Sequence, residues 1–129
     1  MRYFIVALMM LLSSSMAQAK TPFTPEAFQQ AQANNELVLI DVYASWCPTC
    51  KRQSMVLADY FKQHPTSKIK VLVLDFDEQK QWVTHFKAPR QSTLILFKGK
   101  QQLWMSVAET NAEKITTALA LALAQAEAP

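Results

Sequence analysis

Two runs in the middle of the chain are almost entirely apolar and rich in β-branched residues. Residues 37–44 read Leu-Val-Leu-Ile-Asp-Val-Tyr-Ala, and residues 69–76 read Ile-Lys-Val-Leu-Val-Leu-Asp-Phe. Continuous apolar runs of this length indicate strands that are buried on both faces, as in a parallel sheet covered by helices. A helical pattern separates the two runs, so we expect them to pair in parallel through a right-handed crossover.

Four further segments show helical patterns. The first has Thr24 at its N-cap and Pro25 at the first helical position, and it stops at two asparagines. The last begins with the capping-box sequence Thr-Asn-Ala-Glu at 110–113 and then repeats apolar residues at helical spacing. The patterns predict helices over residues 24–33, 47–63, 77–86 and 110–123.

Residues 93–97 and 101–107 are separated by Lys-Gly-Lys, which predicts an antiparallel hairpin. The expected order is therefore helix, strand, helix, strand, helix, strand, strand, helix. A mixed central sheet with helices on both faces is the economical way to cover strands this apolar, so the fold class is α/β.

The first nineteen residues have a different character from the rest. Arg2 precedes an apolar run that ends in serines, and Ala17-Gln18-Ala19 matches a signal-peptidase cleavage sequence. The apolar run has about half the roughly 20 residues that a membrane-spanning helix needs. We expect a signal peptide over residues 1–19, cleavage after Ala19, and one exported domain over residues 20–129.

Charge and cysteine content narrow the class of protein further. Thirteen Lys and Arg stand against ten Asp and Glu, a balance too even to predict a nucleic-acid partner. The chain has two cysteines, both in one Cys-x-x-Cys, so no disulfide framework is available to stabilise the fold. We expect a monomer that needs no cofactor.

The Cys-Pro-Thr-Cys sequence at 47–50 carries the candidate chemistry. Cys47 is placed at the start of a helix, where free backbone N–H groups and the helix dipole favour thiolate over thiol. Pro48 suits the first helical position, and Cys50 follows one turn later on the same face. This spacing predicts an accessible attacking thiol of low pKa at Cys47 and a resolving thiol at Cys50.

Three other interpretations of the two cysteines stay open. A structural disulfide across so short a loop contributes little, because loop-closure entropy falls with loop length. Half of a zinc site needs further ligands, and His64 and His85 stand at separations unlike those of zinc fingers. A buried, unreactive pair is the third alternative.

The mature chain resembles the thioredoxin family. The resemblance is carried by the run DVYASWCPTCK at 41–51 and by TLILFK at 93–98. It implies a thioredoxin-like fold and a redox-active disulfide between Cys47 and Cys50. It also implies that Asp41 is a buried acid that moves the proton of the second cysteine, in keeping with the raised pKa of a carboxyl group among apolar residues. The alternative for Asp41 is a structural, hydrogen-bonded side chain.

The same resemblance implies a substrate groove beside the active turn. Trp46 matches the tryptophan that flanks this groove, and Pro48 and Thr49 lie between the cysteines. The Pro-Thr dipeptide is similar to that of exported reductases of the cytochrome c maturation type. That likeness implies an inner-membrane thiol relay as electron donor, while the direction of exchange depends on the reduction potential.

Three positions depart from the family pattern. Ser92 occupies the place of the family's cis-proline, whose neighbouring backbone pairs with substrate, so Gln91 and Ser92 are substrate-binding candidates. We expect a trans Gln91-Ser92 bond and a groove more permissive to a metal near Cys47. Met55 replaces a proline, and Val73 replaces a lysine that accompanies the buried acid, which predicts a further raised pKa for Asp41.

We therefore expect a periplasmic thiol-disulfide reductase that acts on exported proteins by dithiol exchange. Two alternatives remain: an oxidase of secreted proteins, and a binding protein that holds copper or another soft metal through the dithiol.

Overall fold

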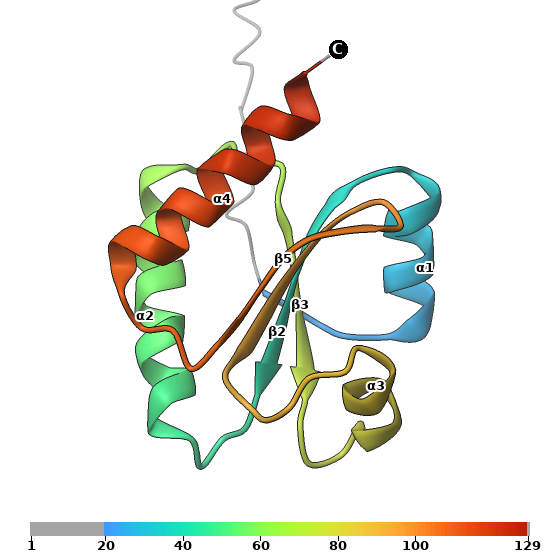
Figure 1. Ribbon diagram of the computed structural model, residues 1–129, viewed down its shortest axis with the longest axis vertical. Helices are drawn as coiled ribbons and strands as arrows, with labels where there is room; N and C mark the ends of the chain where they lie inside the picture. The colour runs from blue at the N-terminus through green and yellow to red at the C-terminus, as the bar shows by residue number, and fades with distance from the viewer. Residues whose placement is uncertain (1–19, 129) are drawn as a thin grey trace, which may run out of the picture.

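The computed structural model describes residues 20–128 (Figure 1). The expected signal peptide therefore lies outside the described residues. Five strands form one mixed sheet in the order β1-β3-β2-β4-β5, with two helices on each side. The elements in chain order are β1 (Thr21–Pro22), α1 (Pro25–Ala33), β2 (Leu37–Tyr43), α2 (Pro48–Gln63), β3 (Lys70–Asp75), α3 (Lys80–His85), β4 (Thr93–Lys98), β5 (Gln101–Val107) and α4 (Ala112–Glu127).

The strand pairing confirms the predicted topology. β2 pairs in parallel with β3 and antiparallel with β4, and β4 forms the expected antiparallel hairpin with β5. The sequence patterns do not predict β1, which pairs in parallel with β3 through only two residues. A strand this short has no periodicity to detect. Between residues 20 and 128, no helix combines the length and apolar character needed to cross a membrane.

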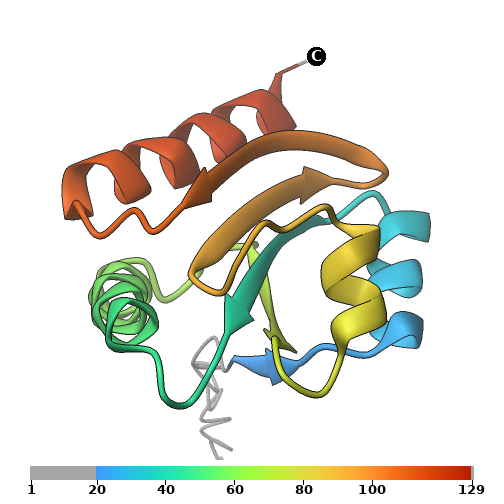
Figure 2. The ribbon, with the colours of Figure 1, turned by 60° about the horizontal axis from the view of Figure 1, so that its bottom comes forward.

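Alternation along the strands divides the core into two layers, one on each side of the sheet. Figure 2 shows the helices that cover the two sides. Even-numbered residues of β2 pack with α1 and α3, and odd-numbered ones pack with α2 and α4. The first layer includes Phe28, Val38, Ile40, Leu72, Phe86 and Ile95. The second includes Leu39, Leu57, Tyr60, Leu94, Ile115 and Leu119.

Side-chain caps fix where the first and last helices begin. The Thr24 hydroxyl accepts the N–H of Ala27 at 3.1 Å, as the sequence predicts. The last helix starts one residue later than expected, because Asn111 rather than Thr110 is the N-cap. The Asn111 carboxamide oxygen accepts the N–H of Lys114 at 3.0 Å, and the helix continues to residue 127.

The third helix also begins later than its sequence suggests. The Asp75 carboxylate accepts the backbone N–H groups of Asp77 and Glu78 at 2.9 and 3.0 Å. Side-chain bonds of this type stabilise a turn in competition with helix. The helix therefore starts at Lys80, and residues 76–79 form the connection.

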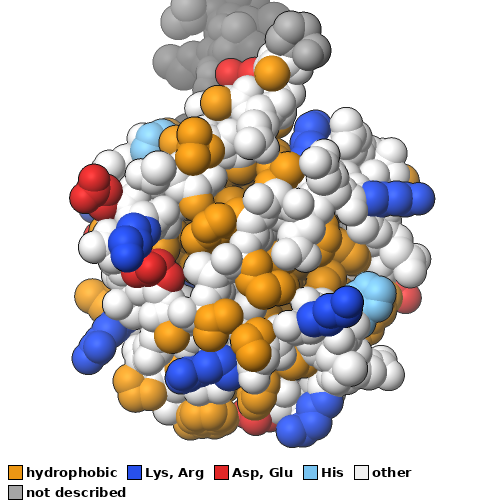
Figure 3. All heavy atoms as spheres, viewed as in Figure 1, with side chains coloured by type: hydrophobic (Ala, Val, Ile, Leu, Met, Phe, Trp, Pro, Cys, Tyr) orange, Lys and Arg blue, Asp and Glu red, His pale blue; other side chains and the backbone are white. Residues whose placement is uncertain are grey.

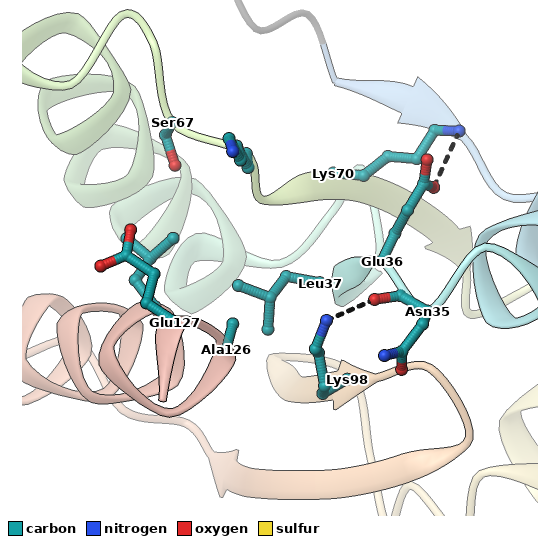
Figure 4. Close-up of a pocket in the computed structure, with 10 residues that line it drawn as sticks. Asn35, Glu36, Leu37, Ser67, Lys70, Lys98, Ala126 and Glu127 are labelled. Carbon is teal, nitrogen blue, oxygen red and sulfur yellow. Dashed lines mark hydrogen bonds and ion pairs between the residues drawn. The ribbon is translucent and has the colours of Figure 1, made fainter. Parts of the chain in front are cut away.

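A hollow of about 580 Å³ lies at the end of the sheet where β2 begins (Figure 4). The Lys70 ammonium lies 3.9 Å from a carboxylate oxygen of Glu36 there, and Lys98 donates to the carbonyl of Asn35. Cys47 follows the opposite end of β2, so this hollow takes no part in sulfur chemistry. Elsewhere, on the face seen in Figure 3, Lys and Arg side chains are spread among acidic and hydrophobic ones.

Candidate active site

The first cysteine is the N-cap residue of α2. Its backbone is extended, and its Sγ accepts the backbone N–H of Cys50 at 3.0 Å. Pro48 occupies the first helical position, where its missing N–H leaves no bond unmade. The expected placement of Cys47 at a helix start, with Cys50 one turn later, is therefore confirmed.

A single hydroxyl group lies against both sulfur atoms, which are free thiols. Ser92 Oγ is 3.1 Å from Cys47 Sγ and 3.3 Å from Cys50 Sγ. Ser92 is fully buried and precedes β4, whose first residue pairs with Val42 of β2. The described residues contain no cis peptide bond, so the Gln91-Ser92 bond is trans as expected.

The two thiols differ in their acidity. Burial has the largest influence on Cys47 and raises its pKa, but hydrogen bonds from the Cys50 side chain, Ser92, the Cys50 N–H and Gln91 outweigh it. The pKa of Cys47 is therefore below its ordinary value. Burial and the hydrogen bond to Cys47 raise the pKa of Cys50, and bonds from Ser92 and the Ala44 backbone offset only part of this. The site favours a thiolate at Cys47 and a thiol at Cys50.

The structure contradicts one expectation for the attacking thiol. Cys47 was expected to be accessible, but only 1% of its surface is exposed. The reason is its position inside the turn, where it packs with Ala44 and Cys50 and contacts Ser92 from the segment before β4. The sulfur is therefore covered by its own turn and by the segment before β4.

Asp41 is buried in the middle of β2, on the same side of the sheet as α2. Burial raises its pKa, and the ammonium of Lys20 opposes that shift from 3.5 Å. Lys20 also donates to the hydroxyl of Ser54 at 3.0 Å. Val73, its partner on β3, leaves Asp41 without the family's lysine, but Lys20 supplies a cation from the start of the domain. The predicted raised pKa of Asp41 is confirmed in direction, and Lys20 limits it.

Replacing Asp41 with Asn should stabilise the protein at neutral pH. A carboxyl group whose pKa is raised by folding favours the native state below its ordinary pKa of 3.8, and this contribution is lost as the pH rises through the folded value. We expect the Asp41→Asn variant to gain about 1 kcal/mol or more in unfolding free energy at pH 7, because an ionised buried group is removed. The gain should vanish near pH 3.

Urea-induced unfolding at both pH values measures this effect. Asp59→Asn is the matched control, because Asp59 is an exposed acid on α2. A stability loss at pH 7 in the Asp41 variant would mean that the Lys20 ion pair outweighs the cost of burying the carboxylate.

The other predicted site residues surround the cysteines. Trp46 is 57% exposed, and its indole N–H donates to the Asp77 carboxylate at 2.8 Å. Pro48 is exposed, Thr49 is half-buried, and the side chain of Gln91 helps to lower the pKa of Cys47. These side chains belong to three segments that the fold brings to one end of the sheet.

Three further residues at the site are not predicted by the sequence patterns. Lys20 and Asp77 gave no signal, because each is one charged residue among many. Gln53 gave a weak signal, because it lies three residues after Cys50, on the face of α2 that buries Leu57 and Tyr60. A polar residue in such a row indicates a specific hydrogen-bonding role.

Within residues 20–128, no group of three or more His, Cys, Asp and Glu side chains is placed to hold a metal ion. His64 ends α2 and stacks on Tyr60, and His85 ends α3 beside Trp82. Both are exposed, as expected for residues at helix ends.

The site consists of a buried strand followed by a helix that begins with Cys-x-x-Cys, and the pKa values of the two thiols differ. These features define the class of thiol-disulfide oxidoreductases. The family model named Thioredoxin matches residues 19–121 of the chain. The protein belongs to the thioredoxin family and is a thioredoxin-type thiol-disulfide oxidoreductase.

Relatives and solved structures agree with this assignment. The chain is 31% identical to thioredoxin of Alicyclobacillus acidocaldarius over 102 residues, which are 79% of this chain and 96% of that protein. The crystal structure of Trxlp from Edwardsiella tarda superposes with a TM-score of 0.74 at 40% identity, covering 78% of this chain and 98% of that one. Mitochondrial thioredoxin 3 of Saccharomyces cerevisiae, at 22% identity and a TM-score of 0.68, shares the fold and covers 78% and 93% of the two chains.

Proposed function

We propose that this protein is an exported reductase that removes disulfides from periplasmic proteins, with Cys47 as nucleophile, Cys50 as resolving thiol and Asp41 as proton acceptor. The proposal rests on one observation. Within one hydrogen-bonded pair, the pKa of Cys47 is lowered and the pKa of Cys50 is raised. Such a pair has one sulfur ready to attack and one that keeps its proton until it is needed.

The first step joins the client to the protein. The Cys47 thiolate attacks one sulfur of the client disulfide, a new S–S bond forms, and the client S–S bond breaks. One client sulfur leaves as a thiolate and takes up a proton from solvent. Trp46 and the Gln91-Ser92 segment flank the client strand, since they lie beside Cys47 and Trp46 is largely exposed.

The second step releases the client. Cys50 transfers its proton to Asp41, and the resulting thiolate attacks the Cys47 sulfur of the mixed disulfide. The bond between Cys47 and Cys50 forms as the second client sulfur leaves, so the client is reduced and the protein is oxidised by two electrons. Asp41 suits this role because its Oδ1 is buried and has no hydrogen-bond partner among residues 20–128.

Export is part of the same proposal. The apolar run before Ala17-Gln18-Ala19 supports a cleaved signal peptide, and the Pro-Thr dipeptide supports a reductase recharged by an inner-membrane thiol relay. N-terminal sequencing of the protein recovered from the periplasm tests the leader directly. Lys20 at the first position is the expected result, and recovery of the uncleaved chain from the cytoplasm would contradict export.

Trapping of clients tests the chemistry. In Cys50→Ala the mixed disulfide on Cys47 cannot be resolved, so we expect covalent complexes with periplasmic proteins that disappear on treatment with a reductant. Cys47→Ala with Cys50 intact is the matched control and should trap none. Absence of complexes in both variants would count against exchange with proteins.

The reduction potential decides the direction of exchange. A reductase requires a potential well below that of strong oxidants, which lie near about −120 mV. Equilibration with glutathione at pH 7 gives the value, and a result near that of the strong oxidants would favour an oxidase of secreted proteins.

A further inference from the structure

We propose that Ser92 is a catalytic residue whose hydroxyl group donates its hydrogen bond to whichever of the two active-site sulfurs is ionised, and that Gln53 positions it. The inference rests on the proposed function and deepens it. Ser92 Oγ is within hydrogen-bond distance of both sulfurs, 3.1 Å from Cys47 Sγ and 3.3 Å from Cys50 Sγ. No other side-chain hydroxyl in residues 20–128 contacts either sulfur through a hydrogen bond.

The backbone of Ser92 is held from three directions. Its N–H donates to the carbonyl of Val42 at 2.9 Å, and its own carbonyl accepts the N–H of Ala108 at 2.9 Å. The same carbonyl accepts the side-chain NH₂ of Gln53 at 2.9 Å, and that NH₂ also donates to the carbonyl of Glu109 at 2.9 Å. Gln53 thus joins α2, which carries Cys50, to the segments on either side of the β4–β5 hairpin.

The conformation of Ser92 also indicates a functional constraint. Its φ is +64°, in the left-handed region that favours glycine, and its neighbour Ala108 has a φ of +57°. A non-glycine residue in this region carries a conformational cost, and the bonds of the Ser92 backbone to Val42, Ala108 and Gln53 hold it there. With the backbone held in this way, the hydroxyl lies within hydrogen-bond distance of both sulfurs.

One hydroxyl has one hydrogen, so it can donate to only one sulfur at a time. In the reduced protein it donates to the Cys47 thiolate, which also accepts the S–H of Cys50. In the mixed disulfide Cys47 has no charge, so the hydroxyl rotates and donates to the Cys50 thiolate as that sulfur loses its proton to Asp41. Ser92 gains and loses no proton overall, and the bonds made and broken are those of the two exchange steps.

This role has a consequence for the reduction potential. A donor to a thiolate stabilises the reduced protein, and a more stable reduced form makes a better oxidant. Ser92 therefore favours rapid attack by Cys47 at the expense of reducing power. Removal of the hydroxyl should make the protein a slower but stronger reductant.

The Ser92→Ala variant tests the proposal. Hydrogen bonds to charged groups change an equilibrium by about ten- to a hundredfold, so we expect the pKa of Cys47 to rise by about 1 to 2 units. The reduction potential should fall by about 30 mV for each tenfold loss of thiolate stabilisation. Thiolate absorbance and the rate of iodoacetamide alkylation, both followed against pH, report the pKa in the purified full-length protein.

Two further variants separate the hydroxyl from effects on folding. Ser92→Gly also lacks the hydroxyl but relaxes the positive φ, and it should raise the pKa of Cys47 as much as Ser92→Ala does. Ser106→Ala removes a buried hydroxyl that has no hydrogen-bond partner among the described residues, and it should leave the pKa unchanged. Unchanged pKa and potential in both Ser92 variants would overturn the proposal.

The positioning role of Gln53 requires a double-mutant cycle. Gln53→Leu should raise the pKa of Cys47 in the wild-type background and have little further effect in Ser92→Ala, since the residue acts through Ser92. Additive shifts would overturn the role of Gln53. If the wild-type protein fails to reduce a model disulfide, the proposed function fails; if it succeeds and Ser92→Ala keeps the wild-type pKa, only this inference fails.

Discussion

Cys47→Ser should lose disulfide exchange down to the uncatalysed rate, a fall of at least about three orders of magnitude. A serine hydroxyl remains protonated where the Cys47 thiol is held as a thiolate by the Cys50 N–H and by Ser92. Without the thiolate, no mixed disulfide forms, and removal of a covalent nucleophile is among the costliest changes to a catalyst. Reduction of a model protein disulfide under constant supply of reductant measures the loss.

Cys50→Ser is the informative companion to this variant. It keeps the attacking thiol and removes only the resolving one, so a single round of attack should persist while turnover stops. Because burial raises the pKa of its thiol, Cys50 should also react slowly with alkylating reagents in the Cys47→Ser variant. Faster attack by Cys50 than by Cys47 would reverse the assigned roles.

Ser92→Pro, which restores the residue that the family pattern has at this position, should destabilise the protein by at least about 3 kcal/mol. Proline fixes φ near −65°, whereas Ser92 has a φ of +64°. Proline also lacks the N–H that Ser92 donates to Val42 at 2.9 Å. The loss in unfolding free energy can be measured by urea titration at neutral pH.

Ala112→Pro provides the matched proline control. Ala112 is the first residue of α4, and Asn111 before it has an extended backbone with ψ of 118°. Proline fits this position and the preceding residue tolerates it, so the control should be close to neutral. Wild-type stability in Ser92→Pro would mean that residue 92 does not require a left-handed backbone.

The fold was predictable because its strands and helices have strong local signals. The β2 and β3 runs are apolar throughout, and their burial on both faces follows from the helices on each side of the sheet. Local signals also placed Cys47 at the start of α2. The errors are at positions where neighbouring residues compete for the same role. Asn111 caps α4 in place of Thr110, and the turn stabilised by Asp75 replaces the expected start of α3.

The parts of the site that could not be predicted depend on contacts between distant residues. Lys20 reaches Asp41 from 21 positions away, and Gln53 bonds to Ser92 from 39 positions away. The resemblance to the family identifies Ser92 as a departure from the family pattern and predicts a groove more permissive to a metal. The contact of its hydroxyl with both sulfurs depends on the left-handed backbone, which no local pattern of this sequence indicates.

The ion pair between Lys20 and Asp41 bears on how the protein can be labelled or immobilised. An affinity tag joined directly before Lys20 would be attached beside this half-exposed lysine and its buried partner. The far end of α4 lies away from the start of α2, at the opposite pole of the molecule (Figure 1). A handle at the carboxyl end therefore leaves the end of the molecule that carries the dithiol unobstructed, which suits attachment to a surface for capturing clients.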